Sequence, residues 1–195
     1  MAKYHILRHF HTINRHRFHV FLNCVRCGIP WRGLVHDLSK YSPAEFFPSA
    51  RFCTGKKSPI GEERKSEGGY SSVFIHHTRH NRHHFEYWVD VTTGDIILIP
   101  IPYKFALEMC CDMISASMVY NGKSYHKGMP LEYFQRNQKK SMMHSATKDF
   151  VTQVLSRYQQ DGFKSIHRKD TKRLYEEINS KYPKIEKIEV LSKQD

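Results

Sequence analysis

Apolar residues recur at helical spacing near the start of the chain, between Thr12 and Arg26. The apolar positions are Ile13, Phe18, Val20, Phe21 and Val25, and a spacing of three to four residues is typical of a helix with one buried face. Gly28 is a helix-stop signal, and Pro30 opens the next element because proline favours the first turn of a helix. We therefore predict a helix over residues 12–26 and a short second helix that carries His36 and Asp37.

Later segments also show helical patterns. The motif SPAE at residues 42–45 has the form of a capping box with proline at the first helical position, which predicts a third helix. A fourth helix is expected over about 72–88, and a long apolar helix over about 102–120. Two or three more helices are expected in residues 130–181. The strand-like stretch is IILIPIP, residues 96–102.

These elements predict the fold class and the domain organisation. We expect an all-α bundle with at most a minor extended segment near residues 95–101. A chain of 195 residues can bury one full core but is short for two ordinary domains, so residues 1–182 are expected to form one domain. Residues 54–72 are polar and contain glycines, and we expect a loop there that could be mobile. Residues 183–195 are expected to form a solvated tail.

The chain is basic, with a net charge of +12 from 31 Lys and Arg against 19 Asp and Glu. This charge favours anionic partners such as nucleotides, nucleic acid and other phosphates. The longest apolar run is far too short to span a membrane, and the basic start lacks the apolar core of a secretory leader. We therefore expect a cytoplasmic protein with no membrane partner. Five cysteines do not suggest a disulfide framework, so we expect buried thiols.

Histidines and carboxylates gather in four places that could hold a metal ion. His16 and His19 lie three residues apart, on the same face of the first helix. His36 and Asp37 are adjacent, so on a helix both could reach one ion only at the helix edge. Neutral imidazole and carboxylate are usual ligands of divalent metals and of iron. A lone histidine in a basic protein, however, is more often a solvated surface group than a ligand.

The other two places lie further along the chain. SSVFIHHTRHNRHHFEYW contains five histidines, which are His76, His77, His80, His83 and His84. On one helix they would form a single stripe, for which solvated surface groups or hydrogen-bonded core histidines are the alternatives to a ligand set. Glu108 and Asp112 lie four residues apart on the long apolar helix, where a buried carboxylate is costly unless a positive group meets it. For Asp112 the alternative is a buried acid paired with an arginine.

These residues carry a resemblance to a known superfamily. A histidine on an early helix, a His-Asp pair on the next, later histidines and an isolated downstream aspartate look like the HD-domain metal-dependent phosphohydrolases. More closely, HTINRH, GLVHDLSKYSPAEF, HHTRHNRHHFEYW and IPIPYKFALEMCCD resemble, in this order, blocks of a family of uncharacterised bacterial and phage proteins. The resemblance covers roughly residues 8–125 and implies an HD-domain-like helical bundle with the metal between helices, in a bacterial or phage-infected cell.

The resemblance also implies ligands. By position it gives metal-binding roles to His16, His36, Asp37 and Asp112, with His19 as a rival for His16. Some superfamily members hold a second metal through extra histidines, which implies His77 and His84, with His76, His80 and His83 as rivals. One or two divalent ions are expected, of Mn, Fe, Co, Ni, Zn or Mg. LSKY follows the His-Asp pair, which departs from the HD-x-x-E-D form of alarmone hydrolases and disfavours an alarmone substrate.

The expected activity is that of a metal-dependent phosphohydrolase or phosphodiesterase that acts on a nucleotide or cyclic nucleotide through a metal-activated water. His36, Asp37 and Lys40 are the expected catalytic residues. Lys40, Arg79 and Arg82 are candidates to hold phosphate oxygens, because positive donors stabilise charge on the transferring group. Each of the three could equally be a solvated surface charge. Two alternatives compete: a di-iron oxygenase on the same scaffold, and a non-catalytic nucleic-acid-binding protein that uses the positive charge.

Overall fold

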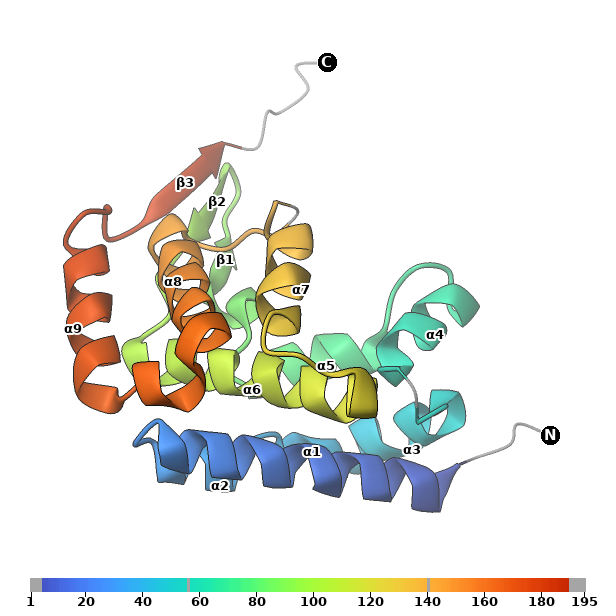
Figure 1. Cartoon of the computed structure of the whole chain (residues 1–195). Helices are drawn as coiled ribbons and strands as arrows, with labels where there is room; N and C mark the ends of the chain where they lie inside the picture. The colour runs from blue at the N-terminus through green and yellow to red at the C-terminus, as the bar shows by residue number, and fades with distance from the viewer. Residues whose placement is uncertain (1–4, 56, 140, 190–195) are drawn as a thin grey trace.

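The structure, a computed structural model, describes residues 5–55, 57–139 and 141–189. Across these residues nine α-helices make up most of the chain (Figure 1), so the predicted mostly helical fold is confirmed. None of the helices described is both long and apolar enough to cross a membrane. The helices are α1 (Ile6–Arg26), α2 (Pro30–Val35), α3 (Pro43–Phe52), α4 (Pro59–Ser66), α5 (Ser72–His80), α6 (Tyr103–Asn121), α7 (Met129–Gln138), α8 (Ser145–Asp161) and α9 (Arg168–Asn179).

The helices pack on both sides of α6 (Figure 1). α1 and α2 lie side by side as a lower layer, and α6 runs along α1 directly above it. α7, α8 and α9 stand on the other side of α6, with α8 in contact with α6, α7 and α9. α3 contacts α1, and α4 and α5 pack against α3. These contacts bring α1, the end of α2, α5 and α6 together, and the candidate site lies at this meeting point.

The main core lies where α1, α6 and α8 meet. α1 contributes the fully buried Val20, α6 contributes Leu107 and Ile114, and α8 contributes Phe150. The long apolar helix expected after Pro102 is therefore the central helix of the fold. The five cysteines, expected as buried thiols, are all free and buried: Cys24, Cys27, Cys53, Cys110 and Cys111.

At Gly33, α2 approaches α1 so closely that a β-carbon would not fit. An ideal Cβ at this position would lie 2.8 Å from the Cα of Phe21 and 2.8 Å from the Cβ of Cys24. The backbone atom of α1 cannot turn aside as the end of a long side chain could, so the two helices would have to separate. Gly33 therefore sets the distance between the helix that leads into His36 and the helix that carries His16.

We expect Gly33→Ala to lower the free energy of unfolding by about 1–3 kcal/mol, the usual cost of overpacking. Gly61→Ala in α4 is the matched control, because a β-carbon there meets nothing within 4 Å and alanine is favoured over glycine in a helix. Urea unfolding of both variants measures the difference. If Gly33→Ala were as stable as the control, the close approach of the helices would carry no energetic weight.

A small antiparallel sheet lies beyond the upper ends of α7 and α8 (Figure 1). Its strands are β1 (Val89–Val91), β2 (Asp95–Leu98) and β3 (Glu186–Glu189), in the order β1-β2-β3. Val89 pairs with Leu98, and Ile96 pairs with Ile188. The segment predicted near 95–101 is thus β2, which ends at Leu98. β1 and β3 were not expected from the sequence.

The expected solvated tail, residues 183–195, is corrected in part. Three of the four residues of β3 are exposed, but the strand pairs with β2 rather than running free. Glu186 also accepts a hydrogen bond from the backbone N–H of Ser145 at the start of α8. A strand with alternating charged residues and one isoleucine carries little hydrophobic signal, so its partner is needed to recognise it. Residues 190–195 lie outside the described residues.

Two other expected boundaries are wrong. The segment 54–72, expected as a loop, contains α4, which begins with Pro59 in its first turn; the expected mobility of this segment stays a prediction. The helix expected over 72–88 ends at His80, and a short 3₁₀ helix, η2 (Phe85–Trp88), follows after a turn. The break lies at Asn81, whose side-chain Nδ2 donates to the His77 carbonyl at 2.8 Å. Asparagine competes in this way with the backbone bonds that would continue a helix.

Candidate metal centre

His36 and Asp37 lie in a turn, and not on the second helix as predicted. α2 ends at Val35, and a 3₁₀ helix, η1 (Leu38–Tyr41), follows Asp37. Asp37 has a φ of 52° and a left-handed backbone, a conformation that aspartate and asparagine tolerate better than most residues. The turn directs both side chains inward, where both are almost completely buried. The expectation that both side chains project from the edge of a helix is therefore wrong.

Arg17 of α1 holds this turn in place. Its Nε donates to the His36 carbonyl at 2.8 Å, and its Nη2 donates to the Leu34 carbonyl at 2.9 Å. A third bond runs from Nη1 to the hydroxyl of Tyr41 at 3.1 Å. The guanidinium thus satisfies carbonyls at the end of α2 that have no partner within the helix. Because α1 also carries His16, Arg17 fixes the turn relative to another candidate ligand.

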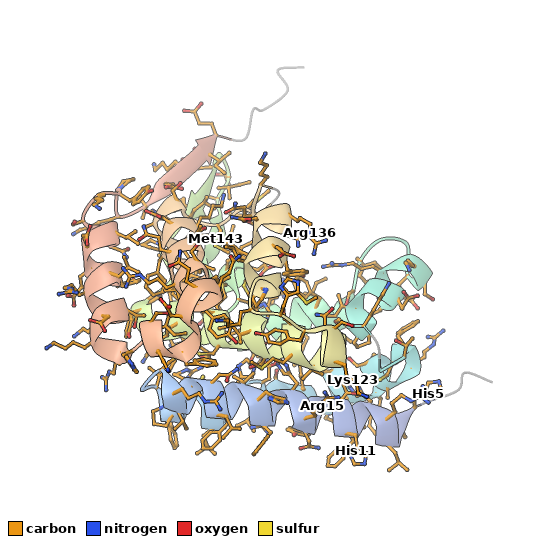
Figure 2. The ribbon with its side chains drawn as sticks, in the orientation of Figure 1. His5, His11, Arg15, Lys123, Arg136 and Met143 are labelled. Atoms are coloured by element: carbon orange, nitrogen blue, oxygen red, sulfur yellow. The ribbon has the colours of Figure 1, made fainter. Side chains whose placement is uncertain are left out.

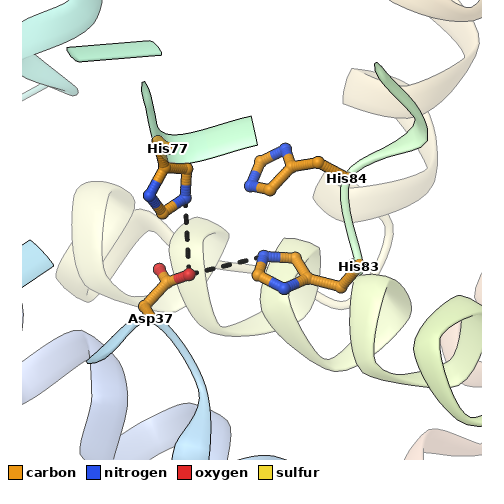
Figure 3. A group of neighbouring side chains, drawn as sticks. All are labelled: Asp37, His77, His83 and His84. Carbon is orange, nitrogen blue, oxygen red and sulfur yellow. Dashed lines mark ion pairs between the residues drawn. The ribbon is translucent and has the colours of Figure 1, made fainter. Parts of the chain in front are cut away.

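The two carboxylate oxygens of Asp37 face different groups. Oδ1 lies 3.4 Å from His77 Nε2 and 3.5 Å from His83 Nε2, as the dashed lines in Figure 3 show. Oδ2 lies 3.2 Å from His36 Nε2 and 2.7 Å from Lys40 Nζ. Asp37 therefore stands between two sets of imidazoles, with one oxygen directed to each.

Nitrogen and oxygen atoms of the site form groups that are tight enough for a metal ion. In the first group, Asp37, His77, His83 and His84 each offer an atom, and these atoms lie within 4.8 Å of one another. Figure 3 shows the His77 and His84 rings above the carboxylate and the His83 ring beside it. We call it the first ligand group. It joins the turn after α2 to α5 and to the turn that follows α5.

A second ligand group consists of His16, His36 and Asp112, whose atoms also lie within 4.8 Å of one another. Asp112 Oδ1 lies 3.0 Å from His16 Nε2 and 3.7 Å from His36 Nε2. A third and overlapping combination, His36, His83 and Glu108, meets the same distance limit. The second ligand group joins α1 and α6 to the turn that contains Asp37.

The polar atoms of these groups fit a cation better than they fit one another. Within the part of the chain that the structure describes, His36 Nε2, Asp37 Oδ1 and both ring nitrogens of His83 are buried without a hydrogen-bond partner, as is His16 Nε2. Such atoms are costly unless something satisfies them. Around an ion with bonds of about 2.1 Å, neighbouring ligand atoms lie roughly 3–3.5 Å apart. The distances from Asp37 to His36, His77 and His83 (3.2, 3.4 and 3.5 Å) lie in this range, as does the distance of 3.0 Å from Asp112 to His16.

The two aspartates are poised as anions. Burial works against their charge, but the positive groups of His36 and Lys40 outweigh it and hold the pKa of Asp37 well below its usual range. For Asp112, burial is likewise outweighed by the adjacent imidazoles of His16 and His36, and its pKa is also well below the usual range. Metal-binding carboxylates must be deprotonated, and both residues meet this condition at neutral pH.

The histidines differ from one another in charge. Burial lowers the pKa of His83 well below its usual value and lowers the pKa of His84 to about 3, so both rings are neutral near pH 7 and have a free lone pair. Burial also opposes a charge on His36, but Asp37 and other carboxylates that include Glu108 outweigh it and raise its pKa well above the usual value. The carboxylates around His36 thus favour a positive charge at its ring.

Two further carboxylates orient the imidazoles of His77 and His36 through the Nδ1 atom of each ring. Glu45 Oε2 lies 2.8 Å from His77 Nδ1, and Glu108 Oε1 lies 3.0 Å from His36 Nδ1. Glu108 also accepts a bond from Arg32 Nε at 2.7 Å. A carboxylate on the second ring nitrogen fixes the tautomer and leaves Nε2 free for a metal. Glu45 does not form the expected capping box, because Ser42 makes no side-chain cap and the Glu45 carboxylate contacts His77.

Glu45→Gln should lower the affinity for metal by about 10–100-fold, the usual cost of losing an outer carboxylate. The amide keeps the shape of the side chain, but it removes the negative charge that makes His77 a stronger ligand. Glu62→Gln, which removes an exposed carboxylate in α4, is the control. Titration with Mn²⁺ or Co²⁺, followed by calorimetry, measures the affinity. Unchanged affinity in Glu45→Gln would mean that Glu45 has only a structural role.

The structure brings some of the expected residues together and leaves others outside. His83, expected only as an alternative ligand, lies in the site because the helix ends before it, and the expected single stripe of five histidines is wrong. His76 binds Glu45 instead, and His80 is exposed and stacks on His76 with ring centroids 4.0 Å apart. His19 lines a separate cleft with Arg15.

Of the three expected phosphate-binding residues, Lys40 lies in the site and Arg79 and Arg82 do not. Lys40 lies in the site, with its Nζ on Asp37 and 30% of its side chain exposed. Arg79 is exposed on α5. Arg82 is exposed as well and lies over the ring of Tyr87, 5.5 Å from its centroid. The site therefore reaches solvent at Lys40 and at Asp112, whose side chain is 22% exposed, and also at His84, whose side chain is exposed to the same extent.

A family model matches residues 5–157 of the chain, and its description is "Family of unknown function (DUF5662)". Searches of the curated proteins and of the solved structures found no match. The matched segment contains both ligand groups together with Glu45, Glu108 and Lys40. Because the match covers well over half of the chain, the protein belongs to this family.

Proposed function

We propose that this member of a family of unknown function is an HD-type, metal-dependent phosphohydrolase that acts on a nucleotide or cyclic nucleotide. The observation that carries the proposal is the position of Asp37, whose two oxygens face two separate groups of histidines. A carboxylate shared by two ligand groups is suited to bridge two metal ions. Paired ions about 3.5–4 Å apart are a recurring arrangement for displacement at phosphorus.

In this proposal, the first ligand group holds one ion and the second ligand group holds the other. Asp37 would contribute to both sites, because its two oxygens face the two ligand groups. Imidazole together with carboxylate suits Mn, Fe, Co, Ni or Zn, whereas Mg prefers oxygen ligands. When bound, such ions supply Lewis acidity and lower the pKa of a coordinated water enough to provide a nucleophile near neutral pH. Glu45 and Glu108 would keep the imidazoles oriented.

The chain's own groups account for substrate binding. Lys40 is partly exposed, and its ammonium lies where the site reaches solvent. We assign it the task of donating to a phosphate oxygen, where a positive donor stabilises charge on the transferring group. Arg79 and Arg82 are exposed, and Arg82 is engaged with Tyr87, so we assign them no role in the reaction. The net charge of +12 favours the approach of an anionic substrate.

The proposal is tested by metal content and by phosphate release. We expect the isolated protein to carry one or two transition-metal ions per chain by elemental analysis. We expect release of phosphate, or opening of a cyclic phosphodiester, from at least one member of a nucleotide panel with Mn²⁺, Fe²⁺, Co²⁺ or Mg²⁺. A protein that contains no metal and is activated by none of these ions contradicts the proposal. Iron-dependent uptake of oxygen without any phosphate release would favour the di-iron oxygenase instead.

A further inference from the structure

The outer face of α1 and α2, on the side away from α6, exposes large apolar side chains. On α1 they follow one stripe at positions 7, 10, 18 and 25, which is the spacing of a single helix face. Leu7 is 78% exposed, and Trp31 on the neighbouring α2 is 68% exposed. We define the outer face by exposed apolar residues of α1, α2 and the start of η1, which are Leu7, Phe10, Phe18, Val25, Trp31, Leu34 and Leu38. Many large apolar side chains exposed on neighbouring elements are typical of an interaction site.

A row of basic residues runs beside the apolar stripe on α1. The row consists of Arg8, His11, Arg15, His19 and Arg26, again at helical spacing. Figure 2 shows His11 projecting from the underside of α1. Arg15 lies near Lys123, and both line a cleft of about 450 Å³ with His19. The arginines of this row, Arg8, Arg15 and Arg26, give the flank of the outer face a positive charge, whereas burial and the neighbouring arginines lower the pKa of His19.

The Lys and Arg side chains near the start of the chain are not balanced by acidic residues. The first 36 residues contain six Lys and Arg and no Asp or Glu. Two of those cations, Arg17 and Arg32, are bound inside the fold, to backbone carbonyls and to Glu108. Arg8 donates to the Thr54 carbonyl and Arg26 donates to Asn23 Oδ1, but α1 carries no acidic residue that could balance the charge of Arg8, Arg15 or Arg26. Apolar side chains with an unbalanced basic flank require a partner that offers both a hydrophobic layer and negative charge.

We propose that the outer face docks on the surface of an anionic phospholipid membrane. Phe10, Phe18 and Trp31 would enter the boundary between headgroups and acyl chains, while Arg8 and Arg15 contact lipid phosphates, as in amphipathic helices that lie in the plane of a membrane. A second copy of the chain fits less well, because pairing two such faces places like charges opposite each other. Nucleic acid would satisfy the arginines but leave the apolar side chains unburied.

The sequence-based expectation of no membrane partner rested on the lack of a spanning segment. Peripheral docking needs no such segment, since the helix lies on the membrane rather than through it. The inference does not depend on the proposed phosphohydrolase activity. A catalytically inactive chain with an intact outer face would bind in the same way.

The full chain is tested by flotation with vesicles of phosphatidylcholine alone and with vesicles that contain about 30% phosphatidylglycerol. We expect binding to the anionic vesicles, weakened by at least about tenfold on pure phosphatidylcholine, because each basic residue near an anionic surface contributes to binding. We expect the fluorescence of Trp31 to shift to shorter wavelength on binding, measured in a Trp88→Phe background, since the chain has two tryptophans.

Three double variants give the proposal its specificity. Leu7→Ser with Phe18→Ser removes apolar area, and Arg8→Glu with Arg15→Glu reverses charge; each should reduce binding to anionic vesicles by at least about tenfold. The matched control is Tyr133→Ser with Arg136→Glu on α7, where both residues are exposed and Figure 2 shows Arg136 far from α1. The control should bind as the original chain does. Circular dichroism checks that each variant keeps its helices.

Several results would overturn the proposal. One is the absence of binding to anionic vesicles, and another is equal loss of binding in the α7 control. A third is a concentration-dependent dimer that Leu7→Ser with Phe18→Ser dissociates while vesicles fail to bind, which would assign the face to a second copy. A fourth is binding of duplex DNA or RNA, sensitive to the arginine variants, without binding of vesicles.

Discussion

Asp37→Asn should remove both metal ions and reduce phosphate release by at least about a thousandfold, well beyond the 10–100-fold typical of an outer carboxylate. Asp37 is the residue whose oxygens reach both ligand groups, and a neutral amide is a poor substitute for an anionic ligand. Asparagine is a better replacement for Asp37 than alanine, because it tolerates the left-handed backbone at this position. The expected loss is therefore chemical rather than conformational.

Elemental analysis and phosphate release with the best substrate of the panel measure this effect. Asp90→Asn, an exposed aspartate in β1, is the matched control and should keep its metal and its rate. Far-ultraviolet circular dichroism should show the same helix content in both variants. An Asp37→Asn variant that retained two ions and normal turnover would falsify the bridging role.

The second large effect should divide the two ligand groups. His84→Ala is expected to lose one metal equivalent and keep the other, and His16→Ala is expected to lose the opposite one. Either variant should lose most of the rate, because a pair of ions can stabilise both the attacking and the leaving oxygen, whereas a single ion cannot. His80→Ala is the control, since this exposed ring binds the His76 carbonyl and not Asp37. Metal content per chain, combined with kcat and KM, distinguishes the cases.

Two other roles for His84 would give different signatures. An imidazolium that contacts substrate phosphate would leave the metal content constant, raise KM on mutation and lose its effect as the pH rises through its pKa. Burial lowers the pKa of His84 to about 3, so this ring is neutral at pH 7, which argues against that role. A packed core histidine would change only the thermal stability. Loss of one ion in His84→Ala excludes both.

Local signals in the sequence were sufficient for most helices. Pro43 and the apolar run after Pro102 each begin a helix at the predicted place, because proline in the first turn and a helical apolar pattern act within a few residues. The end of α5 also has a local cause, the side chain of Asn81. A histidine-rich pattern that continued past it at helical spacing concealed this break.

The site was harder to predict because its geometry depends on distant contacts. The pair His36 and Asp37 could be recognised as candidate ligands, but the turn that directs them inward is held by Arg17, 19 positions before His36 in the chain. Glu45 looked like a capping residue, and its partner His77 lies 32 positions away. Residue types and spacing therefore identified the chemistry, whereas the assignment of particular histidines required the packing of α3 against α5.

The two ligand groups draw on chain segments that are far apart in sequence, from His16 to Asp112. In the unfolded chain these groups are dispersed, so any ions that they hold would bind the native state and would shift the folding equilibrium by mass action. Each ion present at a hundred times its dissociation constant contributes about 2.7 kcal/mol. Without ions, the buried carboxylates and unsatisfied imidazoles oppose their own burial. A chelator should therefore lower the melting temperature of this protein, and of Glu62→Gln, much more than that of Asp37→Asn, which has no ion to lose.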